Sequence, residues 1–224
     1  MEEIIFLVLI LLTILTTFCL YKILDKRGLY FSLIILNLLS FVLSFKITTF
    51  FKLNVNLGIV PLIGALAVIY IFIIKYGYKE IKNIIAITLY SNITTSLLLI
   101  TMNYFLPAIT ETISINMQGV FEYNYKILIT YPLIIAISQY ITIKLFKIIK
   151  DLQSNLYLDI ILTYIITALI YTIVISILSY IKIIDILSSI YVGLSTYIIG
   201  LIIMLINSVF INYFTNRKVT KWEI

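Results

Sequence analysis

The stretch LGIVPLIGALAVIYIFIIKYGYKEIKN, from Leu57 to Asn83, decides the fold of this chain. The eighteen residues from Leu57 to Ile74 carry no charge, and at about 1.5 Å per residue they approach the ~30 Å hydrocarbon core of a bilayer. Three lysines and a single glutamate follow within residues 75–82, which is typical of a cytoplasmic loop. The stretch therefore predicts a membrane-spanning helix that leads into a cytoplasmic turn.

The composition of the whole chain agrees with this prediction. Hydrophobic residues make up 62% of the 224 residues, charged residues make up 12%, and the mean hydropathy is +1.16, which is too apolar for one soluble core. The net charge of +6 is spread over short clusters between apolar runs, so it indicates orientation in a membrane and argues against nucleic-acid binding. Without a repeat or a soluble domain, residues 1–224 are predicted to form a single membrane domain.

Apolar segments divide the chain into about seven predicted spans, so the expected fold is an all-α multi-pass membrane protein. The first is read as a retained helix, because no positive charge precedes it and no small-residue cleavage site follows it. Pro107 is predicted to end the fourth span and to begin a loop that reaches Tyr125. Lys46 is interpreted as a side chain that reaches the membrane interface, with a buried functional lysine as the alternative. The predicted spans cover residues 4–21, 29–45, 57–74, 84–106, 127–146, 157–181 and 186–214.

The distribution of basic residues predicts the orientation of these spans. Twelve of the sixteen lysines and arginines fall in the first, third and fifth connections and in the C-terminal tail. Cytoplasmic loops carry the excess of basic residues in membrane proteins. The N-terminus is therefore predicted outside and the C-terminus in the cytoplasm.

Few residue types that carry catalysis are available. The chain has no histidine and one cysteine, which excludes histidine-dependent triads, HExxH zinc sites and thiolate metal clusters. Asp159 is the only acidic residue within a predicted span, so a pair of intramembrane carboxylates is also missing. We predict a protein that is not an enzyme and that needs no cofactor or metal.

The seventh span has a stripe of small and polar residues that predicts close helix packing. They recur at helical spacing, so they share one face while isoleucine and leucine cover the others. The stripe consists of Ser189, Gly193, Thr196, Gly200 and Asn207.

Two further sets of side chains are candidates for ligand contacts. Tyr157, Tyr164 and Tyr171 lie seven residues apart on one face, where they can stack on a planar ligand, although packing and anchoring to headgroups are favoured. Gln139 and Thr142 can read the polar edge of a ligand at mid-membrane, and hydrogen bonds between helices are the equally favoured alternative.

The order of several short motifs resembles the bacterial vitamin-uptake-like proteins, which are regarded as queuosine precursor transporters. The resemblance spans roughly residues 20–214 and implies a small helical transporter in the bacterial cytoplasmic membrane. Its implied substrate is a 7-deazaguanine base used for tRNA modification. The motifs are Lys26-Arg27-Gly28-Leu29-Tyr30, Lys46 followed by Leu57-Gly58, Tyr76-Gly77-Tyr78-Lys79-Glu80, and Ser138-Gln139-Tyr140 with Leu145-Phe146.

The chain departs from this family at polar positions inside the helices. Compared with the family, it lacks nearly all the carboxylates that would accept the N–H groups of a guanine-like edge. Acidic residues of the family are replaced by Tyr70, Ile74, Thr142, Tyr171 and Asn207, and a lysine is replaced by Gly200.

These departures lead to a prediction about the binding site. A cavity lined by Tyr70, Gln139, Thr142, Tyr171 and Asn207 would contain hydroxyls, amides and aromatic faces but no formal charge. Such a cavity is expected to suit a planar neutral molecule.

Three functions follow from the sequence. The first is uptake of a small planar molecule, with a queuosine precursor as the leading candidate. The second is a substrate-binding membrane subunit that a separate ATPase complex energises, and the third is a membrane scaffold that does not transport. The expected partners are a small-molecule substrate and the lipid bilayer, with no nucleic acid, and a homo-oligomer or an energising subunit is left open.

Overall fold

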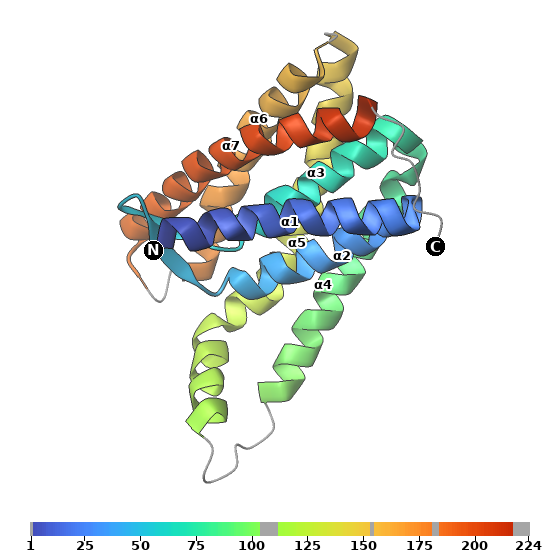
Figure 1. The fold of residues 1–224 in the computed structure, drawn as a ribbon. Coiled ribbons are helices and arrows are strands. Elements are labelled where there is room, and N and C mark those ends of the chain that lie inside the picture. Colours follow the sequence, from blue (N-terminus) through green and yellow to red (C-terminus); the bar gives the residue numbers. More distant parts are fainter. Residues whose placement is uncertain (1, 104–111, 153–154, 181–183, 217–224) are drawn as a thin grey trace.

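The computed structural model describes residues 2–103, 112–152, 155–180 and 184–216. Within these ranges the chain forms seven long helices, each long and apolar enough to cross a membrane (Figure 1). This result confirms the expected all-α multi-pass architecture. The helices are α1 Glu2–Leu24, α2 Lys26–Leu43, α3 Ile59–Tyr76, α4 Ile81–Asn103, α5 Thr112–Leu152, α6 Leu156–Tyr180 and α7 Ile186–Asn216.

Helix α3 occupies the centre of the molecule. Every side chain from Ile59 to Ile73 is buried, and α1, α2, α5 and α7 all contact the helix. In Figure 1, α3 lies between α1 and α7. In a membrane, an apolar helix can be surrounded by lipid or by other helices, and here other helices surround α3.

A short β-hairpin that was not predicted from the sequence joins α2 to α3. Strands β1 Ile47–Phe50 and β2 Leu53–Asn56 pair antiparallel, and the turn between them has positive φ angles at Phe51 (47°) and Lys52 (63°). The ring of Phe50 stacks on Phe6 of α1 with centroids 4.3 Å apart. The hairpin therefore caps the bundle at the end where α1 begins (Figure 1).

Helix α5 starts earlier than predicted. The loop expected between Pro107 and Tyr125 is wrong for residues 112–125, which are helical, while Pro107 itself lies outside the described residues. The helix has 41 residues, or roughly 60 Å at 1.5 Å per residue, which is about twice the hydrocarbon thickness. In Figure 1 its start and the end of α4 project away from the other helices. Apolar periodicity alone cannot distinguish such a helical extension from a loop, because the extension lies outside the apolar run.

The connection between α1 and α2 is also tighter than predicted. Helix α2 begins at Lys26, not at Leu29, so Asp25 alone joins the two helices, with φ 54°. With ψ −127° this is not the left-handed helical conformation that aspartate tolerates, and it lies in a region that favours glycine, so Asp25 has a strained backbone. Lys46 is exposed just before the hairpin, in agreement with its interpretation as an interface side chain.

The small-residue stripe of α7 packs against its neighbours as predicted. A Cβ atom at Gly193 would lie 3.0 Å from the Cα of Ile173 and 3.1 Å from the carbonyl oxygen of Thr172, both in α6. Ser189, Thr196 and the other members of the stripe are buried. Close approach of the two backbones brings many atoms into van der Waals contact, which is a main source of helix association in lipid.

Candidate functional site

A small polar cavity lies where α3, α5 and α6 meet. Its volume is about 20 Å³, enough for about one water molecule. Helix α3 contributes only apolar side chains, whereas α5 and α6 contribute hydroxyl and amide groups, and none of the described residues that line the cavity is charged. Its polar lining consists of Ser138, Gln139, Thr142, Tyr164, Thr167 and Tyr171.

The structure brings together three of the five residues predicted for the binding site. Gln139, Thr142 and Tyr171 all line this cavity. Tyr70 is fully buried elsewhere in the core, where its ring packs on Phe146 with centroids 4.8 Å apart. Asn207 is buried on α7 and donates a hydrogen bond to the carbonyl oxygen of Ile203 in its own helix (3.0 Å). Neither Tyr70 nor Asn207 is among the residues that line the cavity.

Two polar atoms of the cavity lining have no hydrogen-bond partner among the described residues. They are the carbonyl oxygen of Gln139 and the hydroxyl of Tyr164, and both side chains are 1% exposed. The threonine hydroxyls differ, because Thr142 donates to the carbonyl of Ser138 (2.8 Å) within its own helix. Leaving a buried polar group unpaired costs about 1–3 kcal/mol, so these two atoms favour binding of a hydrogen-bonding molecule in the cavity.

Two residues of helix α7 pack against Tyr164. The hydroxyl of Tyr164 occupies space that a Cβ atom at position 200 would need, so only glycine fits at Gly200. The ring of Tyr164 also stacks on Tyr197 of α7, with centroids 6.5 Å apart and an interplanar angle of 3°. Tyr164 was not among the predicted site residues, although its spacing of seven from Tyr171 placed both on one face.

Hydrogen bonds close the hairpin side of the cavity. Asn56, at the end of β2, donates through its side chain to the hydroxyl of Tyr180 (2.7 Å) and through its backbone N–H to Thr196 (3.0 Å). Tyr131 of α5 is hydrogen-bonded to Ser40 of α2. A smaller hollow of about 10 Å³ lies beside these groups, and Tyr171 lines both it and the main cavity. Hydrogen-bonded side chains and a small hollow therefore lie between the hairpin and the cavity.

A groove on the outer surface reaches the cavity from the side. It lies between α5 and α6, has a volume of about 270 Å³ and shares Ser138, Thr167 and Tyr171 with the cavity. The rest of its lining is apolar, including the exposed side chains of Ile137 and Ile141. Such a surface suits lipid chains.

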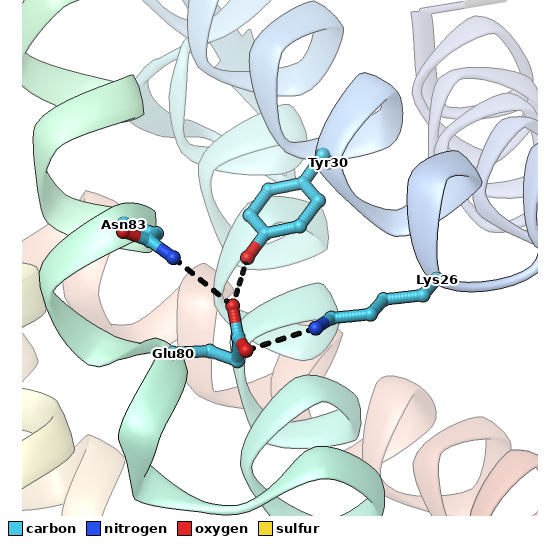
Figure 2. A network of polar contacts seen from close by, with 4 residues as sticks. All are labelled: Lys26, Tyr30, Glu80 and Asn83. Atoms are coloured by element: carbon cyan, nitrogen blue, oxygen red, sulfur yellow. Dashed lines mark hydrogen bonds and ion pairs between the residues drawn. The ribbon is translucent and has the colours of Figure 1, made fainter.

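At the opposite end of the bundle, two of the motifs that resemble the transporter family contact each other (Figure 2). One carboxylate oxygen of Glu80 accepts a hydrogen bond from Lys26 (2.8 Å), and the other accepts from Tyr30 and from Asn83 (3.2 Å). Glu80 follows α3, whereas Lys26 and Tyr30 belong to the first turns of α2. We call Lys26, Tyr30, Glu80 and Asn83 the Glu80 cluster.

Further contacts join the same two turns. The hydroxyl of Tyr76 donates to Asp25 (2.9 Å), and Lys75 donates to the hydroxyl of Tyr21 (2.7 Å). Gly77 has φ 78° and ψ −179°, a backbone conformation that is essentially restricted to glycine. The glycine in the motif Tyr76-Gly77 therefore sets the path of the chain that places Glu80 opposite Lys26.

Comparisons with known protein families, with curated proteins and with solved structures find no match to this chain. Among the described residues, no group of three or more histidine, cysteine, aspartate or glutamate side chains is placed to hold a metal ion. Function is therefore inferred from the chemistry of the cavity and from the quoted motifs.

Proposed function

We propose that this protein is a membrane transporter for uptake of a small, planar, neutral molecule, with the nitrile-bearing 7-deazaguanine precursor of queuosine as the leading candidate. The observation that carries the proposal is that Gln139 and Tyr164, which line the cavity, have an unpartnered carbonyl oxygen and hydroxyl, and that none of the described lining residues is charged. The resemblance of the motifs to queuosine precursor transporters supports the choice of substrate.

The donors and acceptors of such a base match these two atoms. The lactam edge of a 7-deazaguanine offers an N–H group to the Gln139 oxygen and a carbonyl oxygen to the Tyr164 hydroxyl. Tyr171 supplies an aromatic face at the cavity wall on which a ring can stack. A base is larger than a cavity of about 20 Å³, so α5 and α6 must move apart to admit it. A transporter passes through such closed states between its outward-open and inward-open forms.

The absence of charged residues from the lining predicts how the protein discriminates between two precursors. The aminomethyl base carries an ammonium group, and burying that charge without a carboxylate costs several kcal/mol. Each 1.4 kcal/mol reduces affinity about tenfold, so the neutral nitrile base should be strongly preferred.

The test is uptake in a bacterial strain that cannot make the base and lacks its own transporter, with queuosine in tRNA as the readout. We expect the nitrile base to restore queuosine and the aminomethyl base to restore much less. Gln139→Leu should abolish most of this uptake, whereas Tyr140→Phe, on the exposed face of the same helix, should leave it unchanged. Restoration by the aminomethyl base alone would refute the neutral cavity, and restoration by neither base would contradict the proposed function.

A further inference from the structure

Asn37 lies outside the cavity lining but contacts Gln139 directly. It is a residue of α2 with 1% exposure, and its side-chain carbonyl oxygen accepts a hydrogen bond from the side-chain amide N–H of Gln139 (3.0 Å). Its own amide group donates to the backbone carbonyl of Leu33 (2.8 Å) and to the hydroxyl of Thr88 on α4 (3.4 Å). Asn37 thus joins three helices through one side chain.

The contact with Leu33 fixes the orientation of both amides. A backbone carbonyl can only accept, so the NH₂ end of Asn37 must face Leu33 and its oxygen must face Gln139. That oxygen can also only accept, so Gln139 must turn its own NH₂ end toward Asn37. The carbonyl oxygen of Gln139 is then the end left without a partner, as observed.

We infer that Asn37 is a positioning residue that makes the cavity favour ligands with an N–H donor, because it holds Gln139 in the orientation that leaves its carbonyl oxygen without a partner. The inference rests on the proposed binding of a small neutral molecule in this cavity. Asn37 does not itself line the cavity, so it acts through Gln139.

This arrangement assigns the selectivity to one atom. The hydroxyl of Tyr164 can donate or accept, so it adapts to either kind of ligand atom. A free glutamine side chain can also present either end, because its NH₂ and C=O groups exchange places by rotation of the amide. Fixed by Asn37, Gln139 cannot exchange the places of its two ends, so its carbonyl oxygen keeps the position that lacks a partner. A ligand whose ring N–H has been methylated leaves this oxygen unpaired.

The first experiment measures binding of two ligands to the purified full-length protein in lipid nanodiscs. The ligands are the nitrile-bearing 7-deazaguanine and its analogue methylated on the lactam nitrogen. The parent protein should prefer the unmethylated base by at least about tenfold, the order of factor expected when a buried acceptor loses its partner. In Asn37→Leu the ratio of the affinities for the unmethylated and methylated bases should fall to about threefold or less, because the Gln139 amide can then rotate.

The matched control is Ser32→Ala. Ser32 lies on the same helix, is fully buried and donates a hydrogen bond to the carbonyl of Gly28 (2.8 Å) within that helix. This variant should keep the ratio of the parent. Asn37→Ala provides a second test of the same contact if Asn37→Leu does not accumulate. An unchanged ratio in a folded Asn37 variant would overturn the inference, because a purely steric preference does not depend on Asn37.

A second measurement does not depend on the ligand. The protein is labelled with ¹⁵N-glutamine, and the side-chain amide signal of Gln139 is assigned by its loss in Gln139→Leu. In the parent protein this amide should exchange slowly with D₂O. In Asn37→Leu it should exchange at least about tenfold faster, since the bond to Asn37 is lost. If the parent binds neither base, the proposed function fails and this exchange rate alone decides the inference. Equal exchange in parent and variant would show that Asn37 does not hold Gln139.

Discussion

Glu80 shows how a single residue joins parts of the chain that are distant in sequence. Its carboxylate receives three donors from α2 and from the first turn of α4 (Figure 2). The side chains of Glu80 and Lys26 remain 20% and 40% exposed, so water weakens their electrostatic attraction. The main effect of the Glu80 cluster is therefore to fix the relative positions of the segments that it joins. The cluster holds the turn after α1 against the turn after α3.

Reversing the charges of the Glu80 cluster tests this role. Lys26→Glu brings two carboxylates together and should lower the melting temperature in detergent, and Glu80→Lys should do the same with two ammonium groups. The double variant Lys26→Glu/Glu80→Lys restores an opposite-charge pair and should recover most of the loss. Lys79→Glu serves as the control, because Lys79 is exposed in the same turn. A double variant no more stable than the single ones would contradict the role of the pair.

At the scale of elements, the sequence predicts the helices better than the segments between them. The helices follow directly from apolar runs, whose length the bilayer dictates. The hairpin has no comparable signal: its turn places Phe51 and Lys52 at positive φ, where asparagine and glycine are the usual residues. Its position depends on tertiary contacts such as the bond from Asn56 to Thr196, which lies 140 residues away. Local sequence patterns cannot report such contacts.

The packing of α7 against α6 makes a prediction at the same scale. Gly193→Leu should strongly reduce the melting temperature in detergent, because its Cβ already meets backbone atoms of α6 that cannot move aside as a side chain can. Gly200→Leu should also destabilise, and it should displace Tyr164. Overpacking typically costs about 1–3 kcal/mol.

Val209→Leu adds bulk on the same helix at a side chain that is 58% exposed, so it should melt like the parent. Parent-like melting of both glycine variants would mean that the stripe faces lipid instead of α6 and α3.

At the scale of the molecule, the candidate site was only partly predictable. Thr142 and Tyr171 could be selected because they stand where the transporter family that the motifs resemble has acidic residues, and Gln139 because it is a polar group near the middle of an apolar helix. Tyr70 and Asn207 meet the same criterion but face other parts of the interior. The sequence could not distinguish them, because burial alone does not say which helices meet at a given place. Asn37 is also a polar residue in an apolar span, but its importance comes from a contact with a residue 102 positions away, which the sequence does not show.

The orientation of the whole molecule gives the final prediction. Seven spans place the two ends of the chain on opposite sides of a membrane, and the basic residues predict that the hairpin lies outside while the Glu80 cluster lies in the cytoplasm. Single cysteines are introduced into a Cys19→Ser background, because Cys19 is exposed and is the only native thiol. Asn54→Cys in the hairpin and Glu122→Cys in α5 should react with an impermeant thiol reagent added to intact cells. Lys79→Cys and Lys150→Cys should react only after permeabilisation, and labelling of both sets in intact cells would exclude the seven-span orientation.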